Sequence, residues 1–536
     1  MSRRPDPVQA TRRALTGFPI LISILINCPT GGNGQQGEYR MLTQIKGEWV
    51  LGFADGNHRM LCDASVVYEG ERIVHVGTEF DGVADRVIDA RGCLVAPGFI
   101  DTHVHSGHRA LHKLLADGGR PDLFGQPYMD VTIARDGTRI KGYPNYLSRE
   151  EAAVDPGIAL HAAFTVAELL RNGVTTFVEL GGHVMVQEAL WRECERLGVR
   201  GYLGPGYDSG RWAADDQGRL RRVPYPDGGD HLFEEAVAFI KRVQAAGNDL
   251  VNGILVPREV ENCSVDILRR TVQAAQELGV PMATHAGYNV IEFYETVREH
   301  RMTPIELLHS VGMLGPRLNI GHANLISDSP RLNYSGGRDL ALMGEHRVSI
   351  SHCPINIVRR ARVLDSWKKY REAGVNLTIG SDTYPRDMVM NMRTASYHGK
   401  VMSHDLNAAS AAEVFEAATL GGARSLGRTD IGRLEPGARA DVIAINVGRQ
   451  DVLRYGPIWD PIRSLVECGV GDDVELVVTN GQVRMEQGRI AGVDLGALRA
   501  EAQQFADNVW RDLQDWDPLR RTAQAMCPPS FCPDCM

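Results

Sequence analysis

The sequence lacks two features that would place the protein in a membrane or on a nucleic acid. No stretch reaches the roughly 18 consecutive apolar residues that a membrane-spanning helix needs. Positive charge is not in excess either, because 67 acidic residues outnumber 58 basic ones and give a formal net charge of −9 at pH 7. A basic surface is the usual sign of nucleic-acid or acidic-membrane binding. We therefore expect neither partner, and a small-molecule substrate instead.

Regularly spaced cysteines are also missing. Ten cysteines are spread over 536 residues, and most lie inside apolar segments, where reduced thiols pack well. This pattern argues against a disulfide framework and predicts a protein of the reducing cytoplasm. Cys527, Cys532 and Cys535 lie close together, but three thiolates without a fourth ligand are weak evidence for structural zinc. The role of this tail stays open.

Residues 1–40 differ in character from the rest of the chain. Arg12-Arg13 and the apolar run from Phe18 to Ile26 are similar to a twin-arginine export signal with a short hydrophobic core. No small-residue cleavage site follows, and a glycine-rich tract comes next. An assigned start upstream of the true initiator, Met41, explains these features better than export does. We expect residues 1–40 to be a disordered or mis-assigned extension.

Both ends of the remaining chain are rich in short alternating strands. This pattern covers residues 41–95 and returns over residues 426–495, with glycine and aspartate between the strands. Short strands need several partners to be stable, so we expect one small β-sandwich built from both ends. Residues 496–536 are expected to hold a surface helix over residues 497–513, followed by the cysteine-containing tail.

The middle of the chain, residues 96–425, alternates apolar strands with helical segments. This alternation predicts an α/β fold, a (β/α)₈ TIM barrel whose active site lies on the loops after the strands. The long connection from Asp117 to Tyr146 is expected to cover the substrate. The eight expected strands are Cys93 to Ile100, Thr175 to Leu180, Gly201 to Leu203, Gly253 to Val256, Met282 to Thr284, Leu318 to Ile320, Val348 to Ser351 and Leu377 to Ile379.

Four histidines and one aspartate come at or just after the ends of these strands. His103 and His105 are two residues apart, so a strand directs both imidazoles to the same face. His285 follows a later strand as a third nitrogen ligand, and Asp382 follows the last one. Three nitrogens and one carboxylate are typical of a catalytic metal site that leaves a position for water. Asp382 could accept the proton of that water and pass it to the leaving group.

The segment from Val95 to His105 resembles the metal-dependent amidohydrolase superfamily. The likeness extends through Gly173-Val-Thr-Thr-Phe-Val, Ser351-His-Cys-Pro, Gly380-Ser-Asp and Leu434-Glu-Pro-Gly-Ala-Arg-Ala-Asp441, and it is strongest to the triazine hydrolase and cytosine or guanine deaminase branch. The resemblance implies a TIM barrel, a homo-oligomer, and a role for His322 in orienting the attacking water or polarising the substrate. The expected cofactor is one divalent ion, zinc in first place, with iron or cobalt as alternatives.

Two departures from the family pattern shape the expected chemistry. Dinuclear relatives carry a bridging carbamylated lysine after strand four, and the segment ending in Glu259 has none, so we expect a mononuclear site. Glu259 or Glu179 could replace that lysine, although supporting roles fit them better. Deaminases of this branch place glutamate three residues after the strand-five histidine, where this chain has Tyr288. Tyrosine, with a pKa near 10, is a poor proton shuttle, and Glu292 would need an unusual loop to reach the site.

The leading hypothesis is therefore a metal-dependent hydrolase that cleaves a C–N or C–S bond of a small urea, carbamate, thiocarbamate or amide. Such substrates need a polarised carbonyl and a protonated leaving group, but no ring protonation. The alternative is a deaminase or dechlorinase of a triazine, purine or pyrimidine ring. A further alternative is a non-catalytic barrel homologue, which retention of all five metal-site positions argues against.

Several further polar residues are candidates for substrate contacts. Tyr288 is one, and the histidines are His108, His112, His183 and His352. Ordinary packing explains the first three of these histidines better than substrate binding, because helical spacing alone places residues on a shared face. The cluster Arg359-Arg360-Ala-Arg362 could attract an anionic substrate, but a solvated surface is the favoured interpretation.

Overall fold

The computed structural model describes residues 41–106, 110, 113–114, 148–215, 217, 219–449, 452–517 and 519–531. The extension over residues 1–40, the expected covering loop from Asp117 to Tyr146 and the last two cysteines lie outside these ranges. Within the described ranges, no helix is long and apolar enough to cross a membrane.

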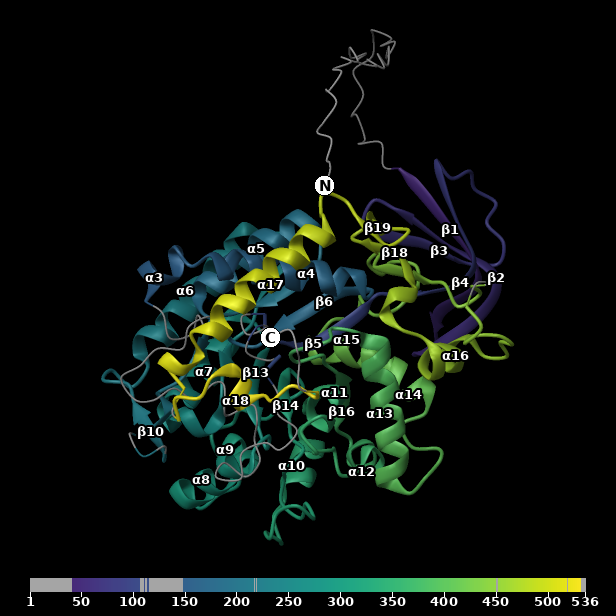
Figure 1. The fold of residues 1–536 in the computed structure, drawn as a ribbon. Helices are drawn as coiled ribbons and strands as arrows, with labels where there is room; N and C mark the ends of the chain where they lie inside the picture. Colours follow the sequence, from purple (N-terminus) through teal and green to yellow (C-terminus); the bar gives the residue numbers. More distant parts are fainter. Residues whose placement is uncertain are drawn as a thin grey trace, which may run out of the picture. The chain divides into compact units, whose positions relative to one another are not determined.

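Both ends of the chain contribute strands to one mixed, eight-stranded sheet (Figure 1). Its order is β20-β19-β18-β17-β4-β1-β2-β3. The N-terminal strands are β1 (Leu42–Ala54), β2 (Asn57–Glu69), β3 (Arg72–Gly77) and β4 (Arg86–Pro97). The C-terminal strands are β17 (Val442–Ile445), β18 (Val474–Thr479), β19 (Gln482–Glu486) and β20 (Arg489–Ile490).

β4 joins the two halves of this sheet. It pairs with β1 in parallel and with β17 in antiparallel orientation. Apolar side chains from both halves, such as Ile45, Val66, Val95, Val442 and Val478, are fully buried in one shared core. Their burial across the junction explains how short strands from distant parts of the chain become stable together.

The middle of the chain contains two four-stranded parallel sheets. One has the order β11-β7-β6-β5 and the other β13-β14-β15-β16. Their strands are β5 (Phe99–Val104), β6 (Val174–Glu179), β7 (Arg200–Leu203), β11 (Val251–Gly253), β13 (Met282–Ala286), β14 (Leu318–His322), β15 (Ser349–His352) and β16 (Asn376–Ile379). A two-residue pair, β8 (Gly206–Tyr207) with β12 (Val256–Pro257), and the hairpin β9 (Gly210–Ala214) with β10 (Leu220–Pro224) accompany them.

Isolated parallel bridges connect the two sheets at both edges. Val104 pairs with Asp382 on one side, and Leu255 pairs with Met282 on the other. The ladder is therefore interrupted, and the described residues do not form one continuous eight-stranded barrel sheet. The bridges nevertheless bring the carboxyl ends of β5, β13 and β16 to the same place, which is where the expected metal ligands lie.

Most expected strands lie where the sequence predicts them, but the fourth and the first do not. The expected strand from Gly253 to Val256 covers the break between β11, which ends at Gly253, and β12, which begins at Val256. The apolar run from Cys93 to Ile100 is divided, since β4 ends at Pro97 in the mixed sheet and β5 begins at Phe99 in the parallel sheet. Gly98 separates the two, and a Cβ there would lie 2.2 Å from the side chain of Thr175. The chain passes from one sheet to the other at a position that only glycine can occupy.

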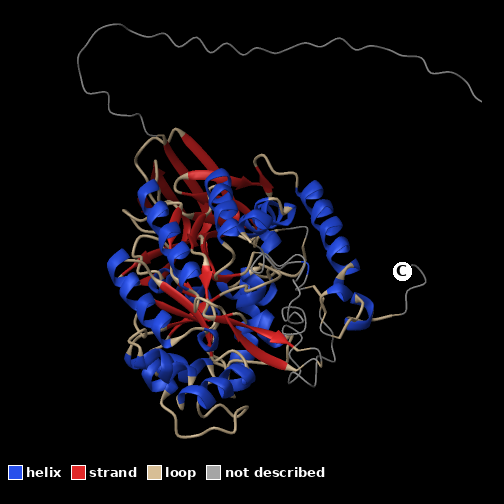
Figure 2. Cartoon of the chain, turned by 90° about the vertical axis from the view of Figure 1, so that its left-hand side faces the viewer, coloured by secondary structure: helices blue, strands red, loops and turns tan. Residues whose placement is uncertain are grey.

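Helices alternate with the parallel strands and surround them (Figure 2). In chain order they are α3 (Arg149–Ala153), α4 (Pro156–Arg171), α5 (Val184–Leu197), α6 (Asp230–Ala246), α7 (Val265–Leu278), α8 (Val290–His300), α9 (Pro304–Ser310), α10 (Asp339–Glu345), α11 (Pro354–Val358), α12 (Trp367–Glu372), α13 (Met388–Ser403), α14 (Ala411–Glu416) and α15 (Gly422–Ser425). After β17 come α16 (Pro461–Cys468), α17 (Leu495–Arg511) and α18 (Ala523–Met526).

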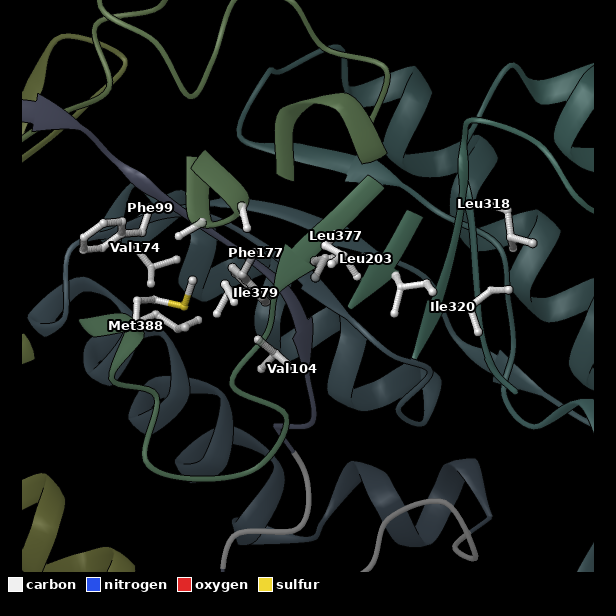
Figure 3. Packing of buried hydrophobic residues seen from close by; sticks show 14 of the residues in the cluster. Phe99, Val104, Val174, Phe177, Leu203, Leu318, Ile320, Leu377, Ile379 and Met388 are labelled. Atoms are coloured by element: carbon white, nitrogen blue, oxygen red, sulfur yellow. The ribbon is translucent and has the colours of Figure 1, made fainter. Parts of the chain in front are cut away.

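Apolar side chains between these strands and helices form the main core (Figure 3). Phe99, Phe177 and Ile379 from the strands and Met388 from α13 are fully buried there. At about 25 cal/mol for each Å² of apolar area removed from water, such residues supply most of the stabilisation that holds the site rigid.

The C-terminal helix is where the sequence predicts it, within two residues at each end, but it is not simply a surface helix. α17 packs against α4, and the ring of Phe505 meets that of His161 edge-on at 4.9 Å. Ala506 and Val509 are buried beside Ala110 and Leu114, which follow the His103-Val-His105 motif. Trp510 also donates a 2.9 Å hydrogen bond to the carbonyl of Ala110.

Candidate metal centre

Three imidazoles meet at the carboxyl ends of β5 and β13. The Nε2 atoms of His103, His105 and His285 are each 3.2 Å from the other two. Bonds of about 2.0 Å to zinc place the nitrogens of a tetrahedral site about 3.3 Å apart. The equal spacing therefore fits three ligands on one small divalent ion, and the three rings are at least nine-tenths buried.

The surroundings of these rings keep them in the form that binds a metal. The Nδ1 of His285 lies 2.7 Å from the carbonyl oxygen of Arg258, so it donates its proton there and leaves Nε2 free as a ligand. Burial, together with the neighbouring imidazoles, holds the pKa of His103 well below its usual value. A neutral ring is what metal coordination requires.

Two glycines make room for His103. A Cβ on Gly321 would lie 2.2 Å from Cε1 and 2.4 Å from Nδ1 of the His103 ring. A Cβ on Gly380 would lie 2.6 Å from the Cβ of His103. The backbone at both glycines therefore approaches His103 more closely than any other residue type would allow.

Asp382 lies beside the three imidazoles. Its Oδ1 is 3.6 Å from the Nε2 of His105 and 3.9 Å from that of His103. Its backbone amide donates to the carbonyl of His103 at 2.7 Å, and its carbonyl accepts from the amide of His105 at 2.8 Å. Burial raises the pKa of its carboxyl. The carboxylate can thus complete the ligand set and exchange a proton at the same place.

His322, at the end of β14, occupies the other side of Asp382. Its Nε2 is 3.4 Å from Oδ2 of Asp382, and its ring centre is 4.7 Å from that of His103. Burial, aided by His285 and nearby arginines, holds the pKa of His322 well below its usual value. A neutral ring beside the carboxylate, but outside the 3.2 Å triangle, suits the orienting role expected of it.

Cys353 is a neighbour of this group that the sequence did not single out. Its sulfur lies within 4.8 Å of possible ligand atoms of His103, His322 and Asp382. Burial raises the pKa of the Cys353 thiol well above its usual value. Because the thiolate is the metal-binding form, the environment argues against Cys353 as a ligand.

The metal centre opens into a small pocket. Tyr288 lines it, as expected of a substrate contact. His105, Glu259, His285, Asn289, His322, Asn324, Asn356, Ile357, Arg360, Arg362 and Asp382 complete the lining. Asn356, which the sequence analysis did not recognise as functional, donates a hydrogen bond to Oδ2 of Asp382 and so fixes the orientation of the carboxylate.

The other histidines considered for substrate contact lie elsewhere. His183 caps α5, where its Nδ1 accepts the amide of Met185 at 3.1 Å, and burial lowers its pKa to about 4. His352 packs edge-on against Trp367 at 6.1 Å, and burial lowers its pKa to about 3. Neither lines the pocket. His108 and His112 lie outside the described residues.

The two glutamates considered as replacements for a bridging lysine have different surroundings. Glu179 accepts hydrogen bonds from the hydroxyl of Ser106 at 2.9 Å and from its amide at 3.3 Å, and burial raises its pKa to about 7. It supports the chain just after His105. Glu259 lies beside His285 in an isolated bridge, and its carboxylate accepts a hydrogen bond from the side-chain amide of Asn262 at 2.8 Å. Both sit at the margin of the centre, and Glu259 lines the pocket.

The side chains of Tyr288 and Glu292 are both hydrogen-bonded to groups other than the three imidazoles. The Tyr288 hydroxyl donates a 2.6 Å hydrogen bond to Glu261, whose carboxyl is buried and also accepts from Trp212 at 3.2 Å. Glu292 caps α8, accepting the backbone amides of Gly287 and Tyr288 at 2.9 and 3.2 Å. The structure thus agrees with the expectation that Glu292 does not reach the site.

The arginine cluster after α11 is not the solvated surface that the sequence favoured. Arg359 stacks on the ring of Tyr384 at 4.0 Å, and Arg360 donates to the carbonyl of Asn356 at 3.0 Å. Arg360 and Arg362 both line the metal pocket. The cluster wraps back toward the centre because Arg362 donates a hydrogen bond to the carbonyl of Tyr288.

Comparison with known proteins is consistent with this centre. The 5-methylthioadenosine/S-adenosylhomocysteine deaminase of Natronomonas pharaonis is 28% identical over 450 residues, covering 83% of this chain and 93% of the relative. The 5'-deoxyadenosine deaminase of Methanothermobacter thermautotrophicus is also 28% identical, over 431 residues, covering 80% of this chain and 90% of the relative.

Solved structures show the same fold. An adenosine deaminase from Xanthomonas campestris with bound zinc has a TM-score of 0.71 at 22% identity, covering 87% of this chain and 98% of that one. An atrazine chlorohydrolase from Arthrobacter aurescens complexed with zinc has a TM-score of 0.70 at 22% identity, covering 87% and 100%. These neighbours imply a TIM-barrel fold with a second domain.

The family pattern of the amidohydrolases matches residues 94–484, which include every expected metal ligand. The chain therefore belongs to the amidohydrolase family and is a metal-dependent hydrolase of carbon–nitrogen bonds other than peptide bonds.

Proposed function

We propose that this enzyme hydrolyses a small urea, carbamate, thiocarbamate or amide, with a single zinc ion held by His103, His105, His285 and Asp382. The observation that carries the proposal is the 3.2 Å triangle of Nε2 atoms with one carboxylate beside it. The ion would supply one thing, the activation of water at neutral pH. Iron or cobalt would suit the same donors, since imidazole and carboxylate bind several divalent metals.

The remaining steps belong to residues of the chain. Asp382 would take the proton of the attacking water and deliver it to the leaving nitrogen or sulfur. Asn356 holds one carboxylate oxygen in place. His322, 3.4 Å from that same oxygen, would orient the water and the substrate carbonyl. Burial of all three side chains keeps bulk water from competing for these hydrogen bonds.

Substrates with an exocyclic carbonyl fit this pocket better than aromatic rings. Addition of water to a ring carbon requires a proton on the neighbouring ring nitrogen, and Tyr288 does not supply it. Burial and the nearby acidic groups raise the pKa of Tyr288 well above its usual value, and its proton is directed at Glu261. A carbonyl needs only polarisation and a protonated leaving group.

Ring deamination or dechlorination is the second candidate. The similarity to proteins named as nucleoside deaminases favours this candidate. Glu259 also favours it, because this residue lines the pocket beside His285. If Glu259 served as the ring acid, it would compensate for the tyrosine at position 288.

One screen separates the two candidates. Metal-loaded enzyme would be assayed against ureas, carbamates, amides, 5'-methylthioadenosine, adenosine and chlorotriazines, with release of ammonia, amine or chloride as the readout. We expect turnover of acyclic carbonyl compounds, loss of turnover with chelator, and recovery with zinc. Turnover of rings alone would reverse the ranking, and full activity in metal-free protein would refute both candidates.

We also propose that the two parallel sheets form one (β/α)₈ barrel over residues 96–425. The bridges Val104–Asp382 and Leu255–Met282 support closure at both edges. A cytoplasmic location and a homo-oligomeric state stay predictions, which cell fractionation and light scattering of the purified protein would test.

A further inference from the structure

Among the residues that the structure describes, Arg362 of the pocket forms no ion pair within 4.0 Å. Its Nη1 donates to the backbone carbonyl of Tyr288, and its Nε is buried without a hydrogen-bond partner among the described residues. The ion pairs of the described chain do not include it, whereas buried Arg200 and Arg386 each have a carboxylate partner. A partly buried guanidinium is costly unless it is paired, so this arrangement favours an external partner.

The protonation state of Arg362 is compatible with anion binding. Burial, with Arg360 nearby, lowers the pKa of Arg362 to about 9, which leaves it charged at neutral pH. Its charge is close enough to His322 and Asp382 to influence both. The guanidinium therefore acts at the metal centre and not on a remote part of the surface.

A second orphaned group lines the same pocket. Both polar atoms of the Asn324 side-chain amide are buried without hydrogen-bond partners among the described residues, and the residue is 1% exposed. A buried amide without partners is rare in a folded protein unless a ligand or water satisfies it. One donor and one acceptor are what a urea or amide group of a substrate would need.

The balance of charge in the pocket favours an anion. The acidic residues that line it are Glu259 and Asp382, and the basic ones are Arg360 and Arg362. A divalent ion would offset both carboxylates and leave the guanidinium charges uncompensated. Arg360 already donates hydrogen bonds to the backbone and side-chain oxygens of Asn356. Arg362 is therefore the better candidate to bind an anion through two of its guanidinium N–H groups.

We propose that Arg362 binds an oxyanion on the substrate, a carboxylate or a phosphonate-like group, while Asn324 binds the amide or urea portion. This deepens the proposed function and rests on it: the substrate would be an acidic urea or amide such as an N-carbamoyl or N-acyl amino acid. Arg362 would then determine specificity without taking part in bond cleavage.

The test compares matched ligands that differ only in charge. N-carbamoyl amino acids, their carboxamides and the corresponding aminophosphonates would be given to full-length, zinc-loaded enzyme. Turnover would give kcat/KM, and calorimetry in an Asp382→Asn background would give affinity without turnover. We expect the wild type to prefer an anion by about 10- to 100-fold over the carboxamide, as one charge-assisted pairing provides. The stronger of the two anions identifies the natural group.

Three variants in the pocket and one control outside it separate specificity from structure. Arg362→Met should abolish the preference for the anion, and Arg362→Lys should retain part of it because charge remains but the fork is lost. Asn324→Leu should weaken acid and carboxamide alike. Arg338→Met, which removes an exposed charge paired with Glu345 at 3.2 Å, should change nothing. Thermal unfolding would verify that each variant is folded.

The outcomes for the inference and for the proposed function are distinct. Equal binding of acids and carboxamides, or a preference that survives Arg362→Met, would overturn the inference even if both are hydrolysed. Arg362-dependent binding of acids without C–N cleavage would uphold the inference and refute the proposed function. Failure of every acid to bind would overturn the inference as well.

Discussion

Asp382 is the residue on which most of the proposed chemistry depends. One of its oxygens faces the ligand imidazoles, and the other lies between His322 and the amide of Asn356. Because its two oxygens have different neighbours, the carboxylate can bind a metal through one oxygen and carry a proton on the other during the same catalytic cycle. Neither neighbour can replace it, because an imidazole with a strongly lowered pKa and a side-chain amide are poor proton acceptors.

We expect Asp382→Asn to lower kcat by about 10²- to 10⁴-fold, the usual contribution of a general base. Steady-state kinetics and metal analysis of the same preparations would measure this. Asp266→Asn, at a side chain that is 77% exposed, is the matched control and should behave as wild type. A variant that retains its metal and keeps full activity would exclude Asp382 as the proton carrier.

The sequence was sufficient to predict that the histidines and the aspartate lie together, but not which other groups surround them. His103 and His285 lie at the carboxyl ends of strands, His105 and Asp382 come just after strands, and strand ends in an α/β fold converge on one edge. Asn356 lies within the short helix α11 and Arg362 follows it, and the direction of that helix depends on packing, so no local pattern placed them in the pocket. His183 precedes a helix directly, and that position could have identified it as a cap.

At the scale of secondary structure elements, the close approach of β14 to β5 defines the metal centre. Gly321→Ala would place a methyl group against the His103 ring, at 2.2 Å from Cε1. We expect zinc affinity to fall by about 10- to 100-fold, as when the supporting surroundings of a ligand are disturbed. Competition with a chelating dye would measure the change.

Gly315→Ala is a suitable control for that experiment. A Cβ at Gly315 would meet no atom within 4 Å, so the same chemical change should leave zinc affinity unaltered. Equal affinities for both variants would show that the strand can yield and that Gly321 is not required for the position of His103.

The start of α8 allows a test of whether Glu292 is structural or catalytic. Its carboxyl accepts backbone amides in a capping box with Asn289. Glu292→Gln should lower the free energy of unfolding by about 1 kcal/mol and leave kcat nearly unchanged, because an amide oxygen caps less well than a carboxylate. Chemical denaturation and kinetics would show this, and a large loss of kcat in a stable variant would make Glu292 part of the mechanism.

The elements themselves were largely predictable, and the exceptions have a physical cause. Apolar runs between helical segments identify buried parallel strands, but they do not show where one sheet ends and another begins. The run from Cys93 to Ile100 contains that boundary at Gly98, and the packing of Thr175 against it comes from a distant strand. Long-range contacts of this kind are not visible in a local pattern.

At the scale of the whole molecule, His58 connects the mixed sheet to the parallel-sheet region. It extends from β2, its ring packs against Phe415 of α14, and its Nε2 lies 3.1 Å from the hydroxyl of Thr419. Burial lowers the pKa of His58 to about 4, against the opposing charge of Glu416. Protonation of this ring is therefore linked to unfolding.

The lowered pKa fixes the sign of the pH dependence. The neutral ring contributes stability that is fully present above the unfolded value near 6.5 and is lost as pH falls through about 4. Between pH 6.5 and pH 4, we expect the free energy of unfolding to fall by on the order of 2 kcal/mol, a figure reduced because the ring is partly exposed. Denaturant unfolding at pH 7 and pH 4.5 would measure it.

His58→Gln should flatten the pH dependence, whereas His231→Gln, at a side chain that is 67% exposed, should not. Parallel curves for wild type and His58→Gln would show that other groups are responsible for acid sensitivity.

The place of β4 in the mixed sheet has a consequence for how the enzyme is made. β4 is synthesised early, yet its partner β17 leaves the ribosome only after more than half of the chain has followed. Until then one edge of β4, rich in buried valine and leucine, has no neighbour and can pair with any other exposed strand. Nascent chains that stall before residue 442 would therefore depend on chaperones, and release from them would coincide with translation of the final strands.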